Sequence, residues 1–162
     1  MKAKARIVFA AMLCVACLAC LVGCSSSDPE ADAQTQNRQY MSSVNTIMET
    51  LNTNMGEFAT AVKDGEVISL DAQLEAVNQC VNDLNALTVP DAMKDIHSAY
   101  VTGATEMQTA LTSYVQLYED VKAPQSGSFD YGTYDSRLAD IQAHYDAGIA
   151  ALQDADSKAQ SA

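Results

Sequence analysis

Positively charged residues are scarce in this sequence of 162 residues. Nine Lys and Arg face 21 Asp and Glu, so the formal net charge at pH 7 is −12. A nucleic-acid binder needs a basic surface that neutralises phosphates, so this composition excludes that class of protein. Three prolines and seven glycines are too few for a collagen-like or low-complexity chain. Apolar residues still make up 48 % of the sequence, which is enough for one domain with an ordinary core.

The sequence also lacks the local motifs of common catalytic sites. It contains no nucleophile elbow, no phosphate-binding loop and no calcium loop with carboxylates at alternate positions. Neither His97 nor His144 follows a glutamate in the Glu-x-x-His pattern of di-iron bundles. We therefore expect a protein that is not an enzyme and that has no cofactor.

No apolar run is long enough for an ordinary membrane span. The longest extends over residues 7–22 and contains 16 residues, whereas a spanning helix needs about 20. Lys2, Lys4 and Arg6 precede this run. A short basic segment followed by a short apolar run is typical of a signal peptide.

The apolar run ends in Leu21-Val22-Gly23-Cys24, and three serines follow. This order resembles the lipobox of bacterial lipoproteins: aliphatic, small or aliphatic, small, cysteine. The resemblance implies that diacylglycerol is attached to Cys24 and that a peptidase removes residues 1–23. Two acyl chains give stable anchoring. The implied location is the bacterial cell envelope, on the outer face of a membrane. The lipid on Cys24 would bind the protein to that membrane, which is therefore one expected partner. The rest of the chain resembles no specific family.

Processing at this point divides the chain into three parts. Residues 1–23 form the lipoprotein signal peptide, and residues 24–34 form the lipidated cysteine and a flexible polar tether. Residues 35–162 form the helical domain. Cys80 is the single cysteine of that domain, so no disulfide framework is available. We expect it to be a buried free thiol, because it lies on an apolar helical stripe.

From residue 35 onward, apolar residues recur with helical spacing, and no segment alternates with period two. The first helix is expected over about 35–63, the second over about 70–87, the third over about 91–121 and the fourth from about 131 to 155. Ser69 is the expected cap of the second helix, and Pro90 ends it. The first helix has two heptad registers, Met41, Met48, Met55 and Val62 in one and Val44, Leu51 and Phe58 in the other. Four amphipathic helices with short connections predict an all-α, up-down-up-down four-helix bundle.

Hairpin geometry estimates which residues lie at one level of the bundle. If Val121 faces Tyr131, His97 lies level with residue 155 of the fourth helix, and His144 lies level with residue 108 of the third. The two histidines are then about 16 Å apart and cannot share a metal. Gly103 and Gly148 lie nearly level, which indicates a close backbone approach or a small cavity.

One cofactor alternative remains open at the level of His144. Met48, Met107 and His144 fall at one height, and thioether and imidazole groups suit copper or haem. The competing interpretation is that both methionines fill core positions and His144 lies at the flank of its stripe. A haem- or copper-binding bundle is therefore the alternative function.

Aromatic residues are unevenly distributed. Six of them map to the end of the bundle far from the tether: Phe58, Tyr114, Tyr118, Phe129, Tyr131 and Tyr134. They are either an aromatic plug that closes this end or a recognition face, because tyrosine combines an apolar ring with a polar tip. We expect a non-enzymatic binding or interaction module that uses this end. Its partner is an envelope protein or a small molecule.

Overall fold

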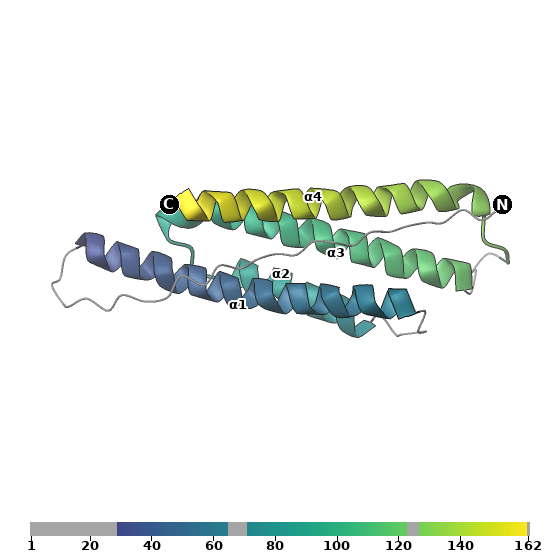
Figure 1. The fold of residues 1–162 in the computed structure, drawn as a ribbon, viewed down its shortest axis with the longest axis horizontal. Helices are drawn as coiled ribbons and strands as arrows, with labels where there is room; N and C mark the ends of the chain where they lie inside the picture. The colour runs from purple at the N-terminus through teal and green to yellow at the C-terminus, as the bar shows by residue number, and fades with distance from the viewer. Residues whose placement is uncertain (1–28, 65–70, 123–126, 162) are drawn as a thin grey trace.

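A computed structural model describes residues 29–64, 71–122 and 127–161. Four helices lie lengthwise beside one another and alternate in direction along the chain (Figure 1). Their bounds are α1 Pro29–Asp64, α2 Asp71–Ala86, α3 Lys94–Lys122 and α4 Tyr134–Ser161, with one-turn 3₁₀ helices η1 Asp91–Met93 and η2 Tyr131–Thr133. No strand occurs in these three segments. The prediction of an all-α, up-down-up-down bundle is confirmed.

The first helix begins earlier than the sequence pattern predicts. We expected a flexible tether up to residue 34, but α1 starts at Pro29. Proline is favoured at the first helical position, and Glu30 and Asp32 place negative charge in the first turn, where it complements the helix dipole. The first turns of α1 extend beyond the other helices (Figure 1), and Tyr40 is the first buried residue.

Of the other helix ends, the C-terminus of α4 differs most from expectation. The second helix ends at Ala86, four residues before Pro90. The fourth helix continues to Ser161, although we expected it to fray after residue 155. Ala155 is completely buried and Ala159 packs against the core, so small side chains extend the apolar face beyond the last large one. The expected capping residue Ser69 lies outside the described residues.

The core takes side chains from all four helices. On α1 the two heptad registers are not equivalent, since Val44 and Leu51 are buried while Met48 and Met55 are half-buried. The helix therefore turns its valine–leucine edge inward and its methionine edge toward the side of the bundle. Cys80 on α2 is a buried free thiol, as predicted. The remaining core is contributed mainly by α3, with Ile96, Tyr100, Ala104, Met107, Leu111 and Val115.

The backbones of α3 and α4 approach each other closely at Gly103 and Gly148. A Cβ at position 103 would lie 3.1 Å from the carbonyl oxygen of Gly148 and only 2.6 Å from Cγ of Leu152. A Cβ at position 148 would lie 3.1 Å from the carbonyl oxygen of Gly103. The two glycines permit backbone contact here, which is one of the two outcomes expected from the sequence.

The N-terminal half of α4 is less buried than its C-terminal half. Between Tyr134 and Ala147 no residue is buried, whereas Gly148, Leu152 and Ala155 are. The end of the bundle where α3 ends and α4 begins is therefore the more open part of this hairpin. None of the helices in the described segments is both long enough and apolar enough to cross a bilayer.

Candidate functional site

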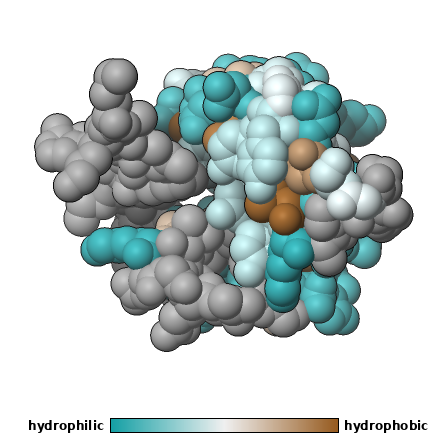
Figure 2. Space-filling view, turned by 90° about the vertical axis from the view of Figure 1, so that its right-hand side faces the viewer, coloured by the Kyte–Doolittle hydropathy of each residue, from teal (hydrophilic) through white to brown (hydrophobic). Residues whose placement is uncertain are grey.

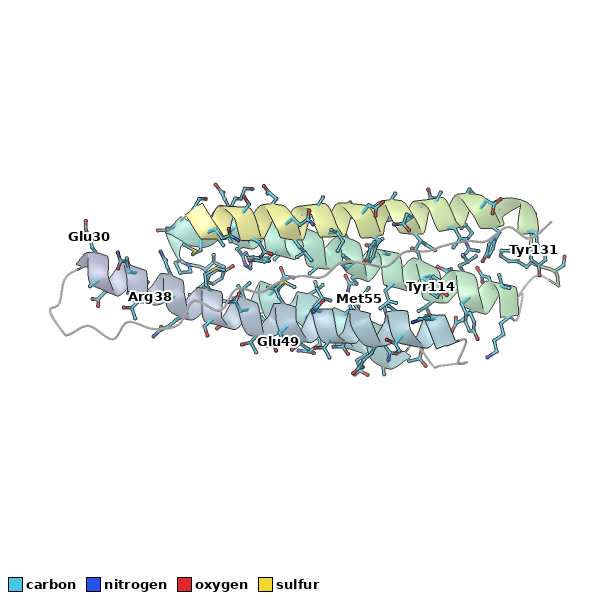
Figure 3. All side chains as sticks on the ribbon, viewed as in Figure 1. Glu30, Arg38, Glu49, Met55, Tyr114 and Tyr131 are labelled. Carbon is cyan, nitrogen blue, oxygen red and sulfur yellow. The ribbon has the colours of Figure 1, made fainter. Side chains whose placement is uncertain are left out.

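Tyrosine and phenylalanine side chains gather where α3 ends and α4 begins. We call this the aromatic end and define it by Tyr114, Tyr118, Phe129, Tyr131 and Tyr134. Tyr131 is 72 % exposed and Tyr134 is 37 % exposed, and they are the exposed large hydrophobic residues of the described chain. Figure 3 shows Tyr131 at the extreme tip and Tyr114 further along the bundle.

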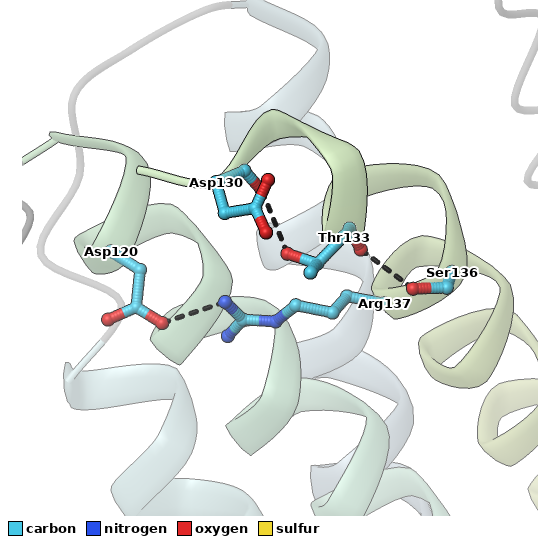
Figure 4. Close-up of polar contacts among 5 residues, drawn as sticks. All are labelled: Asp120, Asp130, Thr133, Ser136 and Arg137. Atoms are coloured by element: carbon cyan, nitrogen blue, oxygen red, sulfur yellow. Dashed lines mark hydrogen bonds and ion pairs between the residues drawn. The ribbon is translucent and has the colours of Figure 1, made fainter. Parts of the chain in front are cut away.

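A compact set of hydrogen bonds fixes the turn that carries the exposed rings. The carboxylate of Asp130 accepts a hydrogen bond from the backbone N–H of Gly132 at 2.9 Å, which caps η2. The hydroxyl of Thr133 donates to the carbonyl of Asp130, and the hydroxyl of Ser136 donates to the carbonyl of Thr133 (Figure 4). Tyr131 therefore projects from a fixed turn at the start of α4.

Phe129 is the ring on which the exposed tyrosines rest. Its centroid lies 5.1 Å from that of Tyr131 and 6.4 Å from that of Tyr134, with both ring pairs nearly perpendicular. Such edge-to-face contacts are the favoured geometry of aromatic pairs. The guanidinium of Arg137 lies 6.0 Å from the centre of Phe129 and also pairs with Asp120 at 2.8 Å (Figure 4).

Two further tyrosines form the inner part of the aromatic end. Tyr114 and Tyr118 on α3 are half-buried. Burial raises the pKa of Tyr114, and the neighbouring Tyr134 and Tyr118 raise it further. The phenol groups of Tyr118 and Tyr134 are therefore close enough to affect the ionisation of Tyr114. The ammonium of Lys122 lies 5.9 Å from the centre of the Tyr118 ring.

The structure thus brings together five of the six aromatic residues singled out from the sequence. The sixth, Phe58, belongs to α1, but its side chain lies outside what the structure describes. In the view onto this end, apolar atoms are visible near the middle, between more hydrophilic side chains (Figure 2). The inner rings occupy positions that suit a plug, and the outer rings present a surface to solvent.

A second cluster, at the opposite end, was missed by the sequence analysis. The hydroxyl of Tyr40 on α1 lies 3.0 Å from Nδ1 of His97 on α3, and the hydroxyl of Tyr100 donates to Asp156 of α4 at 2.6 Å. Burial lowers the pKa of His97. It also raises the pKa of Tyr40 to about 12. The sequence did contain one indication of this cluster, because the level estimate placed His97 beside residue 155 of the fourth helix.

The three residues that were considered for copper or haem, Met48, Met107 and His144, contact different neighbours. Nδ1 of His144 lies 2.6 Å from a carboxylate oxygen of Glu106, while Met107 packs against Gly148. Met48 is half-buried on α1. Within the described segments no three His, Cys, Asp or Glu side chains converge as a metal site would require. For these residues, binding of copper or haem stays an untested prediction. The predicted lipidation site, Cys24, lies outside the described residues.

Comparison with known proteins adds one finding. Searches of curated proteins and of solved structures found no match. A family model matches residues 33–127, which include most of α1, all of α2 and α3, and none of Phe129, Tyr131 or Tyr134. Because more than half of the chain is matched, the protein belongs to this family, a family of unknown function (DUF6376).

Proposed function

We propose that this protein is a lipid-anchored, extracytoplasmic binding module without enzymatic activity, which presents its aromatic end to a protein of the cell envelope. The observation that carries the proposal is the exposure of Tyr131 and Tyr134 on a hydrogen-bonded turn. Exposed aromatic residues on a fixed scaffold are favoured at binding surfaces, because they bury much area and lose little conformational entropy.

The position of the aromatic end relative to the proposed anchor supports this function. The first residue of α1 and the aromatic end lie at opposite ends of the bundle (Figure 1). With 36 residues, α1 alone is about 54 Å long. A lipid on Cys24, a few residues before α1, would therefore hold one end at the membrane and direct the exposed tyrosines away from it.

The lipid anchor is supported by the sequence and is tested separately from the binding surface. The basic residues Lys2, Lys4 and Arg6, the apolar run 7–22 and the lipobox 21–24 occur in the required order. The parent chain and a Cys24→Ala variant are compared for uptake of radiolabelled palmitate and for membrane fractionation. Labelling of the parent alone supports the anchor. A parent that takes up no palmitate and fractionates like the variant contradicts it.

The binding surface is tested in intact cells with a photo-cross-linking amino acid at position 131. The control carries the same amino acid at Thr105, which is exposed on the middle of α3. We expect a discrete cross-linked partner from position 131 and not from position 105. In a pull-down of the partner so identified, without any cross-linker, the double variant Tyr131→Ala/Tyr134→Ala should lose capture while its helical circular dichroism is unchanged. Equal capture by parent and variant would reject the aromatic end as the site.

A further inference from the structure

Carboxylates at the aromatic end outnumber the cations that neutralise them. The described residues 117–122 and 127–140 contain five acids, Glu119, Asp120, Asp130, Asp135 and Asp140, and two bases, Lys122 and Arg137. Arg137 is already paired with Asp120. Within the described chain, Glu119, Asp135 and Asp140 have no ion-pair partner. The aromatic end is therefore negative, as is the whole chain with its net charge of −12.

The rings of this end already bind cations of the protein itself. Lys122 lies over Tyr118 at 5.9 Å, and Arg137 lies over Phe129 at 6.0 Å. These are cation–π contacts, in which the negative face of the ring attracts a positive group. Tyr131 lies nearly perpendicular to Phe129, is the most exposed of the three rings, and receives no cation from the described residues.

Two carboxylates stand next to this open ring in the chain. Asp130 directly precedes Tyr131, and its carboxylate is fixed by the N–H of Gly132. Asp135 follows in the first turn of α4 and is exposed. An exposed aromatic ring with neighbouring carboxylates attracts a positive group by a cation–π interaction and by charge–charge attraction. The negative net charge of the chain also increases the association rate of a positive partner.

We propose that the aromatic end recognises a cationic segment of its partner, in which a lysine or arginine side chain lies over the ring of Tyr131. Asp130 and Asp135 interact with that cation or with its basic neighbours. This inference rests on the proposed function, because it names the chemistry of the partner that the same surface binds. An acidic segment is the alternative that the experiment separates.

The test uses two fluorescein-labelled peptides of equal length, one alternating lysine with serine and the other alternating glutamate with serine. Fluorescence anisotropy follows their binding to the full bundle domain. We expect the lysine peptide to bind and the glutamate peptide not to bind. Tyr131→Leu keeps apolar volume but removes the ring, and it should weaken binding of the lysine peptide by about twofold to fivefold. Tyr131→Phe keeps the ring and should bind like the parent.

Non-specific attraction by an acidic protein is measured with a matched charge variant. Glu49→Gln removes one exposed carboxylate from the middle of α1 (Figure 3), whereas Asp135→Asn removes one beside the aromatic turn. The asparagine variant should weaken binding and the glutamine variant should not. Equal effects of the two variants, or equal binding of the two peptides, would overturn the inference. A cross-linked partner at position 131 together with failed lysine-peptide binding would reject the cationic chemistry and leave the proposed function standing.

Discussion

The hydroxyl of Tyr100 on α3 donates a hydrogen bond to Oδ1 of Asp156 on α4 over 2.6 Å, and the Tyr100 residue itself belongs to the apolar core. Tyr100 is only 3 % exposed, so its hydroxyl has lost most of its contact with water. One turn earlier, His97 meets Tyr40 of α1. Two adjacent polar contacts therefore join α1, α3 and α4 at the end opposite the aromatic end.

Replacement of Tyr100 by phenylalanine should destabilise the bundle measurably. The variant removes the donor for Asp156 and leaves the ring in place, so the change isolates the hydrogen bond. A hydrogen bond to a charged group contributes about 1.5–3 kcal/mol, and because Asp156 is only half-buried we expect a loss of about 1–2 kcal/mol. Urea denaturation followed by circular dichroism measures the difference. Tyr131→Phe removes an exposed hydroxyl and should leave the free energy of unfolding unchanged.

Gly103→Ala should destabilise the α3–α4 hairpin. The added Cβ would lie 2.6 Å from Cγ of Leu152 and 3.1 Å from a backbone oxygen, so the helices must separate or Leu152 must move. Overpacking of this kind costs about 1–3 kcal/mol. The free energy of unfolding from urea melts is the measurement.

Gly56 supplies the matched control for this substitution. It is exposed on α1, and a Cβ there meets nothing within 4 Å. Gly56→Ala should stabilise the protein by about 0.5–1 kcal/mol, because alanine loses less backbone entropy in a helix. If both alanine variants shift stability in the same direction, the contact at Gly103 does not control packing of the hairpin.

His97 should make the bundle less stable in mild acid. Burial lowers its pKa below the ordinary value of 6.5. When the pH falls through 6.5, the unfolded chain takes up a proton at this residue before the folded chain does, so the free energy of unfolding decreases. The decrease is complete once the pH is below the pKa of the folded state. Asn can offer an acceptor to Tyr40 without titrating, so His97→Asn should lose this component of the acid sensitivity.

Urea melts at about pH 7.5 and about pH 5.5 test this prediction. The parent should lose more stability over this interval than His97→Asn. Above about pH 7.5 the imidazole is neutral in both states, so the two proteins should respond to pH in the same way. Identical losses in the acid interval would mean that His97 is not the responsible group.

Residues that follow a strict repeat were predictable, but the rotation of each helix toward its neighbours was not. Val44 and Leu51 were assigned to the core by their seven-residue spacing, and both are buried. The same spacing assigned Met48 and Met55 to the core, but both are only half-buried. Periodicity predicts an apolar stripe along the helix and does not predict how that stripe is rotated toward the other helices. Tyr40 belongs to neither seven-residue register, although it lies four residues before Val44 and so on the same face of the helix.

The level estimate predicted contacts between α3 and α4 to within about one helical turn. It placed His97 beside residue 155, and the adjacent Tyr100 binds Asp156. It placed Gly103 and Gly148 together, and their backbones meet. It could not say that His144 turns toward Glu106, because one turn of error covers several candidate partners. At the aromatic end, the sequence predicted which residues gather there. Which of them are exposed could be known only from the structure, because it depends on the path of the chain through η2.

Cys80 offers a chemical test of the core. Its Sγ lies 3.8 Å from the carbonyl oxygen of Ile47, and the residue is 2 % exposed. Burial raises the pKa of the thiol, and the negative charge of Asp83 raises it further, so the reactive thiolate is scarce. In a chain that begins after Cys24, Cys80 is the single cysteine.

A disulfide reagent should therefore modify Cys80 slowly in the folded protein, and roughly tenfold or more faster in denaturant. The control is the double variant Cys80→Ala/Thr105→Cys, which moves the thiol to an exposed position of α3. Its cysteine should react at nearly the same rate with and without denaturant. If Cys80 of the folded parent reacts as fast as this control, α2 does not pack its thiol against α1, and the arrangement of the bundle would have to be different.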